Sequence, residues 1–211
     1  MIETIQNSIV NAFDGNPLLA TFIIALLPIF ELRAAIPFGM SASIWGVCAL
    51  SPIQAFLISF LATSLIIPFI ALIFIPLLNY LKTTKPFKNI SEKLINHFKK
   101  KADSVNKNNT KSNWLKIFLV MSFVAIPLPL TGVYTGTVIA VLMGLNFYEC
   151  LLACVSGNLI AGIIITLISS VLKENSIYLL IAFIGILILT ILFSLIKKLI
   201  IKLKAKKQNI A

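Results

Sequence analysis

The stretch Glu31-Leu-Arg-Ala-Ala-Ile-Pro37 places two opposite charges, on Glu31 and Arg33, inside an otherwise apolar part of the chain. The apolar run before it, residues 18–30, rises only about 20 Å as a helix, whereas a bilayer core is roughly 30 Å thick. After Pro37 an apolar, glycine-containing stretch continues to about residue 50. Two half-length helices around a charged break, which Pro28 and Pro37 mark, indicate a re-entrant hairpin. A single kinked span through Glu31 is the alternative.

The composition of the whole chain agrees with a location in the bilayer. Of its 211 residues, 59% are hydrophobic and 12% are charged. Soluble domains carry roughly 25% charged residues, so a soluble globule is excluded, and the high hydrophobicity excludes a disordered chain. The apolar stretches are long and do not alternate, which indicates a helical membrane protein rather than a barrel.

The net charge of +11 is a topology signal. All of the 18 Lys and Arg residues except Arg33 and Lys173 lie in two blocks, residues 82–116 and 197–207. Neither block is interleaved with stacking aromatic residues, so we expect no nucleic-acid partner. Basic residues beside apolar spans stay in the cytoplasm and face anionic lipid headgroups, so both blocks and the C-terminus are placed there.

The second half of the chain repeats the opening pattern. A half-length apolar run, residues 114–126, leads into Pro127-Leu-Pro-Leu-Thr-Gly-Val-Tyr-Thr-Gly136, and an apolar stretch follows to about residue 145. Residues 53–81 in the first half and 147–172 in the second are long enough to span the membrane. A short turn then leads to a last span over residues 177–196.

Two cytoplasmic basic blocks require an even number of crossings between them. The second hairpin therefore opens to the cytoplasm and the first to the outside, which is the inverted-repeat plan of secondary transporters. The predicted fold is an all-α, multi-pass protein of the cytoplasmic membrane, a single membrane domain over residues 1–211. Its parts are a first hairpin and span (18–81), a basic cytoplasmic loop (82–113) with an amphipathic helix over 87–98, a second hairpin and span (114–172), an extra C-terminal span (177–196) and a basic tail (197–211).

Glu31 and Arg33 are the residues that most need a purpose. Each charge at the centre of a membrane helix costs about 2.5–3.5 kcal/mol. Residues two apart on an α-helix point about 200° away from each other, so either the backbone is not helical there or each residue has its own partner. One interpretation is a structural, mutually neutralising pair. In the other, Arg33 binds a phosphate or carboxylate and Glu31 carries a proton, because burial favours a neutral carboxyl group.

The uncharged break that begins at Pro127 supplies different groups. Prolines free the carbonyls one turn earlier, glycines allow close backbone approach, and N–H groups at the start of the next half-helix can bind an anion. A proline kink with small packing residues is the simpler interpretation. The candidate substrate- or ion-binding residues are Glu31, Arg33, Pro37, Pro127, Pro129, Thr131, Gly132, Tyr134, Thr135 and Gly136.

The two motifs resemble the paired signatures of the small multidrug export protein family, which is distantly similar to DedA-like membrane proteins. The resemblance runs from about residue 18 to residue 172, although Ala34 and Leu130 occupy positions where that family frequently has glycine. It implies two re-entrant hairpins, one carrying the acidic–arginine motif and one the proline–glycine motif, and a transport activity. For DedA-like relatives it implies movement of lipid or polyprenyl phosphate and proton-dependent drug tolerance.

We therefore expect a proton-coupled secondary transporter that exports a drug or moves a phospholipid-like anion. The alternative is a non-transporting scaffold for envelope integrity. No nucleophile–base–acid arrangement and no cluster of metal ligands is visible in the sequence, so we expect neither an enzyme nor a cofactor. The oligomeric state stays open, with a homodimer as one alternative.

Overall fold

The computed structural model describes residues 2–81, 109–128 and 131–172, together with residues 178, 181, 182, 184–186, 188 and 189. Several predictions fall outside this part of the chain: the amphipathic helix over 87–98 with most of its basic loop, Pro129, most of the span over 177–196, and the tail over 197–211. Every regular element in the described residues is helical.

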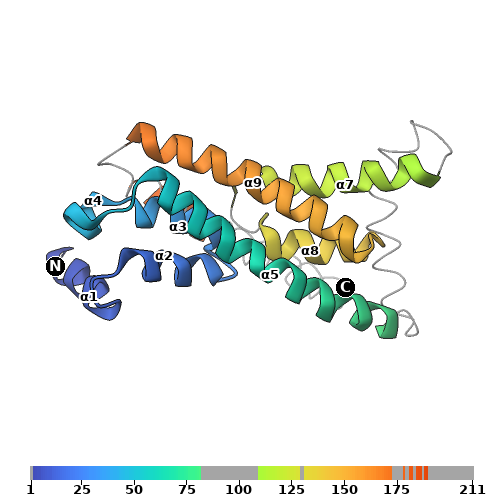
Figure 1. Cartoon of the computed structure of the whole chain (residues 1–211), viewed down its shortest axis with the longest axis horizontal. Coiled ribbons are helices and arrows are strands. Elements are labelled where there is room, and N and C mark those ends of the chain that lie inside the picture. Colours follow the sequence, from blue (N-terminus) through green and yellow to red (C-terminus); the bar gives the residue numbers. More distant parts are fainter. Residues whose placement is uncertain are drawn as a thin grey trace, which may run out of the picture.

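Two long helices, α5 (Pro52–Leu81) and α9 (Phe147–Leu172), run the length of the molecule and pack against each other (Figure 1). Both are long and apolar enough to cross a membrane, over Pro52–Leu77 and Phe147–Leu172, and their bounds agree with the two spans predicted there. Pro68 and Pro76 lie inside α5 without ending it.

The two long helices also begin in the same way, with a reciprocal capping box. The Ser51 N–H donates to Gln54 Oε1 at 3.0 Å, and the Gln54 N–H donates to Ser51 Oγ at 3.4 Å. Before α9, the Asn146 N–H donates to Glu149 Oε2 and the Glu149 N–H donates to Asn146 Oδ1, both at 2.9 Å. In each case two N–H groups that have no partner within the helix are satisfied.

The first half of the chain opens with α1 (Ile2–Ala12) and then forms two short helices, α2 (Pro17–Leu26) and α3 (Glu31–Gly39). The Asn16 side chain caps α2 by accepting the N–H groups of residues 18 and 19. Helix α2 ends because Leu27 precedes Pro28 and is extended, with φ −76° and ψ 130°.

Helices α2 and α3 lie antiparallel. Gly39, at the end of α3, approaches the middle of α2 so closely that a Cβ there would lie 2.4 Å from Thr21 Oγ1. The chain thus reverses between the two helices, and the alternative of a single kinked helix through Glu31 is wrong. The predicted extent of the break is also wrong, because the interruption covers residues 27–30 alone. Glu31 and Arg33 belong to the first turn of α3.

The chain beyond α3 corrects one further detail. The second half-length helix was expected to continue to about residue 50, but α3 ends at Gly39. It is followed by α4 (Ala42–Trp45) and the 3-10 turn η1 (Gly46–Cys48). Gly46 has a φ of +55°, a left-handed conformation that glycine adopts readily and that separates η1 from α4.

The second half contains the corresponding pair, α7 (Asn109–Ala125) and α8 (Val133–Leu142), separated by a break over residues 126–132. The two pairs of short helices lie at opposite ends of the molecule, and both breaks lie near its middle (Figure 1). The contacts match in kind: α2 packs on α5 as α7 packs on α9, and α3 and α8 each touch both long helices.

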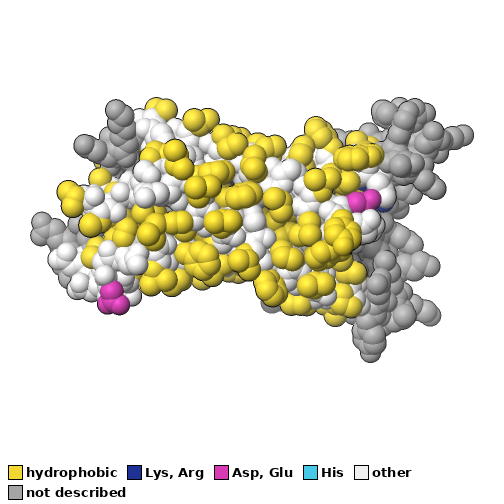
Figure 2. Space-filling model, in the orientation of Figure 1, with side chains coloured by type: hydrophobic (Ala, Val, Ile, Leu, Met, Phe, Trp, Pro, Cys, Tyr) yellow, Lys and Arg dark blue, Asp and Glu magenta, His cyan; other side chains and the backbone are white. Residues whose placement is uncertain are grey.

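Small residues let these helices approach closely. A Cβ on Gly157 of α9 would lie 2.6 Å from the Met121 carbonyl of α7, and one on Gly162 would lie 2.7 Å from the Phe56 ring of α5. Such small-residue contacts are typical of helix packing in membranes. The outer surface between the two ends is largely hydrophobic (Figure 2).

Candidate functional site

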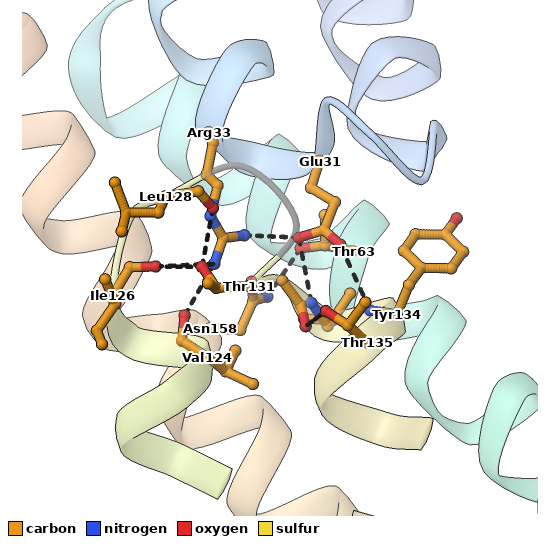
Figure 3. Close-up of polar contacts among 12 residues, drawn as sticks. Glu31, Arg33, Thr63, Val124, Ile126, Leu128, Thr131, Tyr134, Thr135 and Asn158 are labelled. Atoms are coloured by element: carbon orange, nitrogen blue, oxygen red, sulfur yellow. Dashed lines mark hydrogen bonds and ion pairs between the residues drawn. The ribbon is translucent and has the colours of Figure 1, made fainter. Parts of the chain in front are cut away.

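The side chain of Arg33 connects the first half of the chain to the break in the second. Its Nη1 donates to Glu31 Oε2 at 2.6 Å. Its Nη2 donates to the carbonyls of Val124 and Ile126, at 2.9 and 3.3 Å, and to Thr131 Oγ1 at 3.4 Å (Figure 3). The residue is 2% exposed. The guanidinium therefore binds carbonyls at the end of α7, which have no partner within the helix and form the negative end of its dipole.

The carboxylate of Glu31 lies at the start of α8. Oε2 accepts the N–H of Val133 at 3.1 Å, and Oε1 accepts the N–H of Tyr134 at 3.4 Å. The residue before this helix, Gly132, has no side chain that could cap it. Glu31 is thus a cap supplied from another helix, and it lies where a helix N-terminus attracts an anion.

The pair depends on an unusual backbone conformation. Glu31 has a φ of +48°, which is rare for a residue with a side chain and costs about 1–3 kcal/mol. It brings Glu31 and Arg33 within 2.6 Å although they are two residues apart. The sequence suggested either a non-helical backbone or a separate partner for each residue, and the structure has both. The backbone at Glu31 departs from helical geometry, and each of the two residues also has partners of its own.

Position 132 needs a glycine because a side chain there would overlap the Glu31 carboxylate, not because of its backbone angles. Its φ is −80°, but a Cβ built on it would lie 1.6 Å from Glu31 Oε2, and the next two nearest atoms also belong to that carboxylate. Only a glycine allows the carboxylate to reach the N–H groups of Val133 and Tyr134.

The hydroxyl groups around the second break make different contacts, and that of Tyr134 joins the two pairs of short helices. Thr131 donates to the carbonyl of Ile126 or Leu128, at 2.7 and 2.8 Å. The Tyr134 hydroxyl donates to the Leu26 carbonyl at the end of α2. Thr135 donates to the Gly132 carbonyl at 3.2 Å, within its own helix.

The structure therefore brings together most of the residues predicted for the site. Thr131, Gly132 and Tyr134 lie directly against the charged pair. Pro127 follows Ile126, whose carbonyl accepts from Arg33, and Thr135 donates to the Gly132 carbonyl. Two further candidates lie elsewhere. Pro37 is inside α3, one turn beyond Arg33, and Gly136 packs on Val124, whose Cγ2 would be 2.2 Å from its Cβ.

Sequence reasoning missed a second buried polar contact. Asn158 of α9 donates through Nδ2 to Thr63 Oγ1 of α5 at 2.8 Å and to Ser64 Oγ at 3.3 Å. Asn158 and Thr63 are fully buried, and each lies twelfth from the start of its long helix. The sequence signal for this contact is an asparagine inside an apolar span. Aligning the two long helices by their capping boxes places it opposite Thr63.

Two long apolar helices, short helices that break between them and a buried ion pair define a helical membrane protein. The family model described as "Putative small multi-drug export protein" matches residues 31–164, and the chain belongs to that family. The match begins at Glu31 itself, so it includes α3 and the second break but neither α2 nor the first break. No curated protein and no solved structure matches the chain.

A double-mutant cycle tests the contact between Gly132 and Glu31. We expect Gly132→Ala to lower the free energy of unfolding in detergent by about 1–3 kcal/mol, because the added methyl group overlaps the carboxylate. In a Glu31→Ala background the same change has much less effect, since the overlapping atoms are gone. Equal effects in both backgrounds, measured by thermal unfolding, would contradict this geometry.

Exchanging the two charges tests their orientation. Glu31→Arg with Arg33→Glu keeps the pair but places a cation at the start of α8 and an anion against the carbonyls of α7. We expect this variant to be less stable than the uncharged Glu31→Gln, Arg33→Gln variant by several times the roughly 0.3–2 kcal/mol of one helix-end interaction. If the charge-exchanged variant has the same unfolding temperature as the wild type, the helix ends do not orient the pair.

Proposed function

We propose that this chain is a proton-coupled carrier for an amphipathic anion, whose phosphate or carboxylate headgroup takes the place of the Glu31 carboxylate. One observation carries the proposal. The two groups in the site that attract an anion, Arg33 and the N-terminus of α8, are both bound to Glu31. The chain's own carboxylate thus occupies a preformed anion site.

The same contacts favour an anion over a hydrophobic cation. A cation would have to bind Glu31 beside Arg33, whose Nη1 lies 2.6 Å from the carboxylate. A phosphate group instead offers several acceptor oxygens to the donors that Glu31 now uses. The forked guanidinium and two adjacent backbone N–H groups suit such a headgroup. In this proposal the transported compounds are amphipathic anions, and the direction of their transport follows the proton gradient.

Protonation of Glu31 couples the exchange to pH. A neutral carboxyl group loses most of its attraction to Arg33 and to the helix end, so the anion binds more strongly as the pH falls. Among the described residues, the titratable side chains that interact electrostatically with Glu31 are Arg33, Tyr134 and Cys154. The anion and the proton therefore enter together, and the site returns to its resting state when both have left.

An inverted repeat would allow the site to face either side of the membrane. The matched contacts of α2, α3 and α5 with those of α7, α8 and α9 support two like units, as do the shared capping boxes of α5 and α9. In this proposal the two hairpins are re-entrant, enter from opposite faces and meet at the ion pair. Rocking one unit against the other alternates access.

Membrane vesicles test the proposal. In proteoliposomes with an imposed pH gradient, we expect the wild-type chain to move labelled polyprenyl phosphate about tenfold faster than it does without a gradient. Glu31→Gln should lose this dependence, because the residue can no longer exchange a proton. Asp14→Asn makes the same chemical change at an exposed residue and should behave as wild type.

Three outcomes would contradict the proposal. In the first, Glu31→Gln keeps the full response to the gradient. In the second, a hydrophobic cation is transported and the phosphate lipid is not. In the third, the folded wild-type chain transports neither, which would favour a scaffold role in which the ion pair only joins the two pairs of short helices.

A further inference from the structure

A pocket lies between the N-terminal halves of α7 and α9, and its lining includes neither Glu31 nor Arg33. Its volume is about 240 Å³, less than the roughly 300–1,000 Å³ of pockets for drug-sized ligands. It therefore suits one headgroup rather than a whole drug molecule. Its lining residues are Asn113, Trp114, Ile117, Tyr148, Glu149 and Leu152.

The lining divides into a polar end and an apolar end. Glu149 and Asn113 form the polar end, where Asn113 Nδ2 donates to Glu149 Oε1 at 3.0 Å. Ile117 and Leu152 lie one turn further along their helices. Trp114 and Tyr148 are 63% and 80% exposed, so two large aromatic side chains lie at the surface beside a carboxylate. On the face that Figure 2 shows, acidic side chains appear at each end of the molecule and hydrophobic ones between.

Among the residues that line the pocket, Glu149 is the one with a charged side chain, which favours a cation. The full negative charge of Glu149 exceeds the roughly half positive charge of the α9 N-terminus that it caps. Aromatic faces of Trp and Tyr attract organic cations further. Lys116, whose Nζ lies 3.5 Å from Asn113 Oδ1, does not line the pocket. It would suit the phosphate of a zwitterionic headgroup.

We infer that this pocket binds an alkylammonium group that carries an apolar tail. The ammonium lies between Glu149 and the two aromatic rings, and the tail follows Ile117 and Leu152 toward the hydrophobic surface. The ligand is either a free organic cation or the amine headgroup of a phospholipid. This site is independent of Glu31, so an amphipathic cation binds to the protein without entering the anion site.

The chain contains its own control for the key substitution. Gln54 occupies in the α5 capping box the position that Glu149 has in the α9 box, and it makes the same type of contacts. A glutamine thus supports this cap, and Glu149→Gln removes the charge while the helix start is kept. Gln54→Glu adds a charge to the other cap, at the start of α5, and Gln54 does not line this pocket.

The experiment is a calorimetric titration of the full chain in neutral maltoside micelles with decyltrimethylammonium. We expect Glu149→Gln to weaken binding about tenfold, because a charge-assisted contact near the surface is lost. Trp114→Leu, which keeps the carboxylate, should weaken it about threefold or more. Gln54→Glu should bind as wild type, and decyl sulfate should bind no more weakly to Glu149→Gln than to wild type.

The source of the ligand follows from the same titration in lipid nanodiscs. The ratio of wild-type to Glu149→Gln affinity cancels the attraction of an anionic lipid surface for the cation. A smaller ratio in phosphatidylethanolamine than in phosphatidylglycerol identifies a lipid amine as the competing occupant, whereas equal ratios identify free organic cations. The inference is overturned if Glu149→Gln binds decyltrimethylammonium as tightly as wild type, or if Gln54→Glu loses as much affinity. Neither result depends on Glu31, so failure here leaves the anion carrier untouched.

Discussion

The structure depends on a buried ion pair that lies between the end of α7 and the start of α8. Arg33 binds the carbonyls that end α7, and Glu31 binds the N–H groups that begin α8. A charge that stands alone at the centre of a membrane helix costs about 2.5–3.5 kcal/mol. Here each charge meets the other and also a helix end of opposite polarity. The free carbonyl and N–H groups at the break between α7 and α8 therefore stabilise the two charges of α3, and the charges satisfy these backbone groups in return.

This arrangement sets strict conditions on the residues around it. The turn at Glu31 needs a left-handed backbone, which places the carboxylate toward α8 while Arg33 points to α7. Gly132 leaves room for the carboxylate, and the Tyr134 hydroxyl joins α8 to the end of α2. The two charged groups are thus held by contacts within the protein. In the proposed function an anion displaces the Glu31 carboxylate when that group takes up a proton.

The sequence alone was enough to predict both long helices, the two half-length pairs and the residues of the charged centre. Those predictions rest on strong signals. A long apolar run and a charge inside an apolar stretch are each compatible with few other structures. The position of the first break was wrong because two prolines were taken as its limits. Only Pro28 ends a helix, whereas Pro37 is accommodated inside α3.

Other features could not be predicted because they depend on three-dimensional placement. No periodicity shows that Glu31 caps a helix more than a hundred residues later, or that Arg33 binds main-chain carbonyls, which leave no trace in side-chain chemistry. The left-handed turn at Glu31 has no glycine or asparagine to mark it. The contact between Asn158 and Thr63 becomes visible only when the two long helices are aligned by their capping boxes.

In the proposed exchange, Glu31 is an ionised, internal occupant of an anion site and becomes protonated when a substrate anion replaces it. Infrared difference spectroscopy of the full chain, before and after addition of polyprenyl phosphate, measures the protonation state of this carboxyl group. We expect a protonated carboxyl band to appear on addition and to be absent in Glu31→Gln. If the phosphate binds while the Glu31 carboxylate stays ionised, the exchange does not occur.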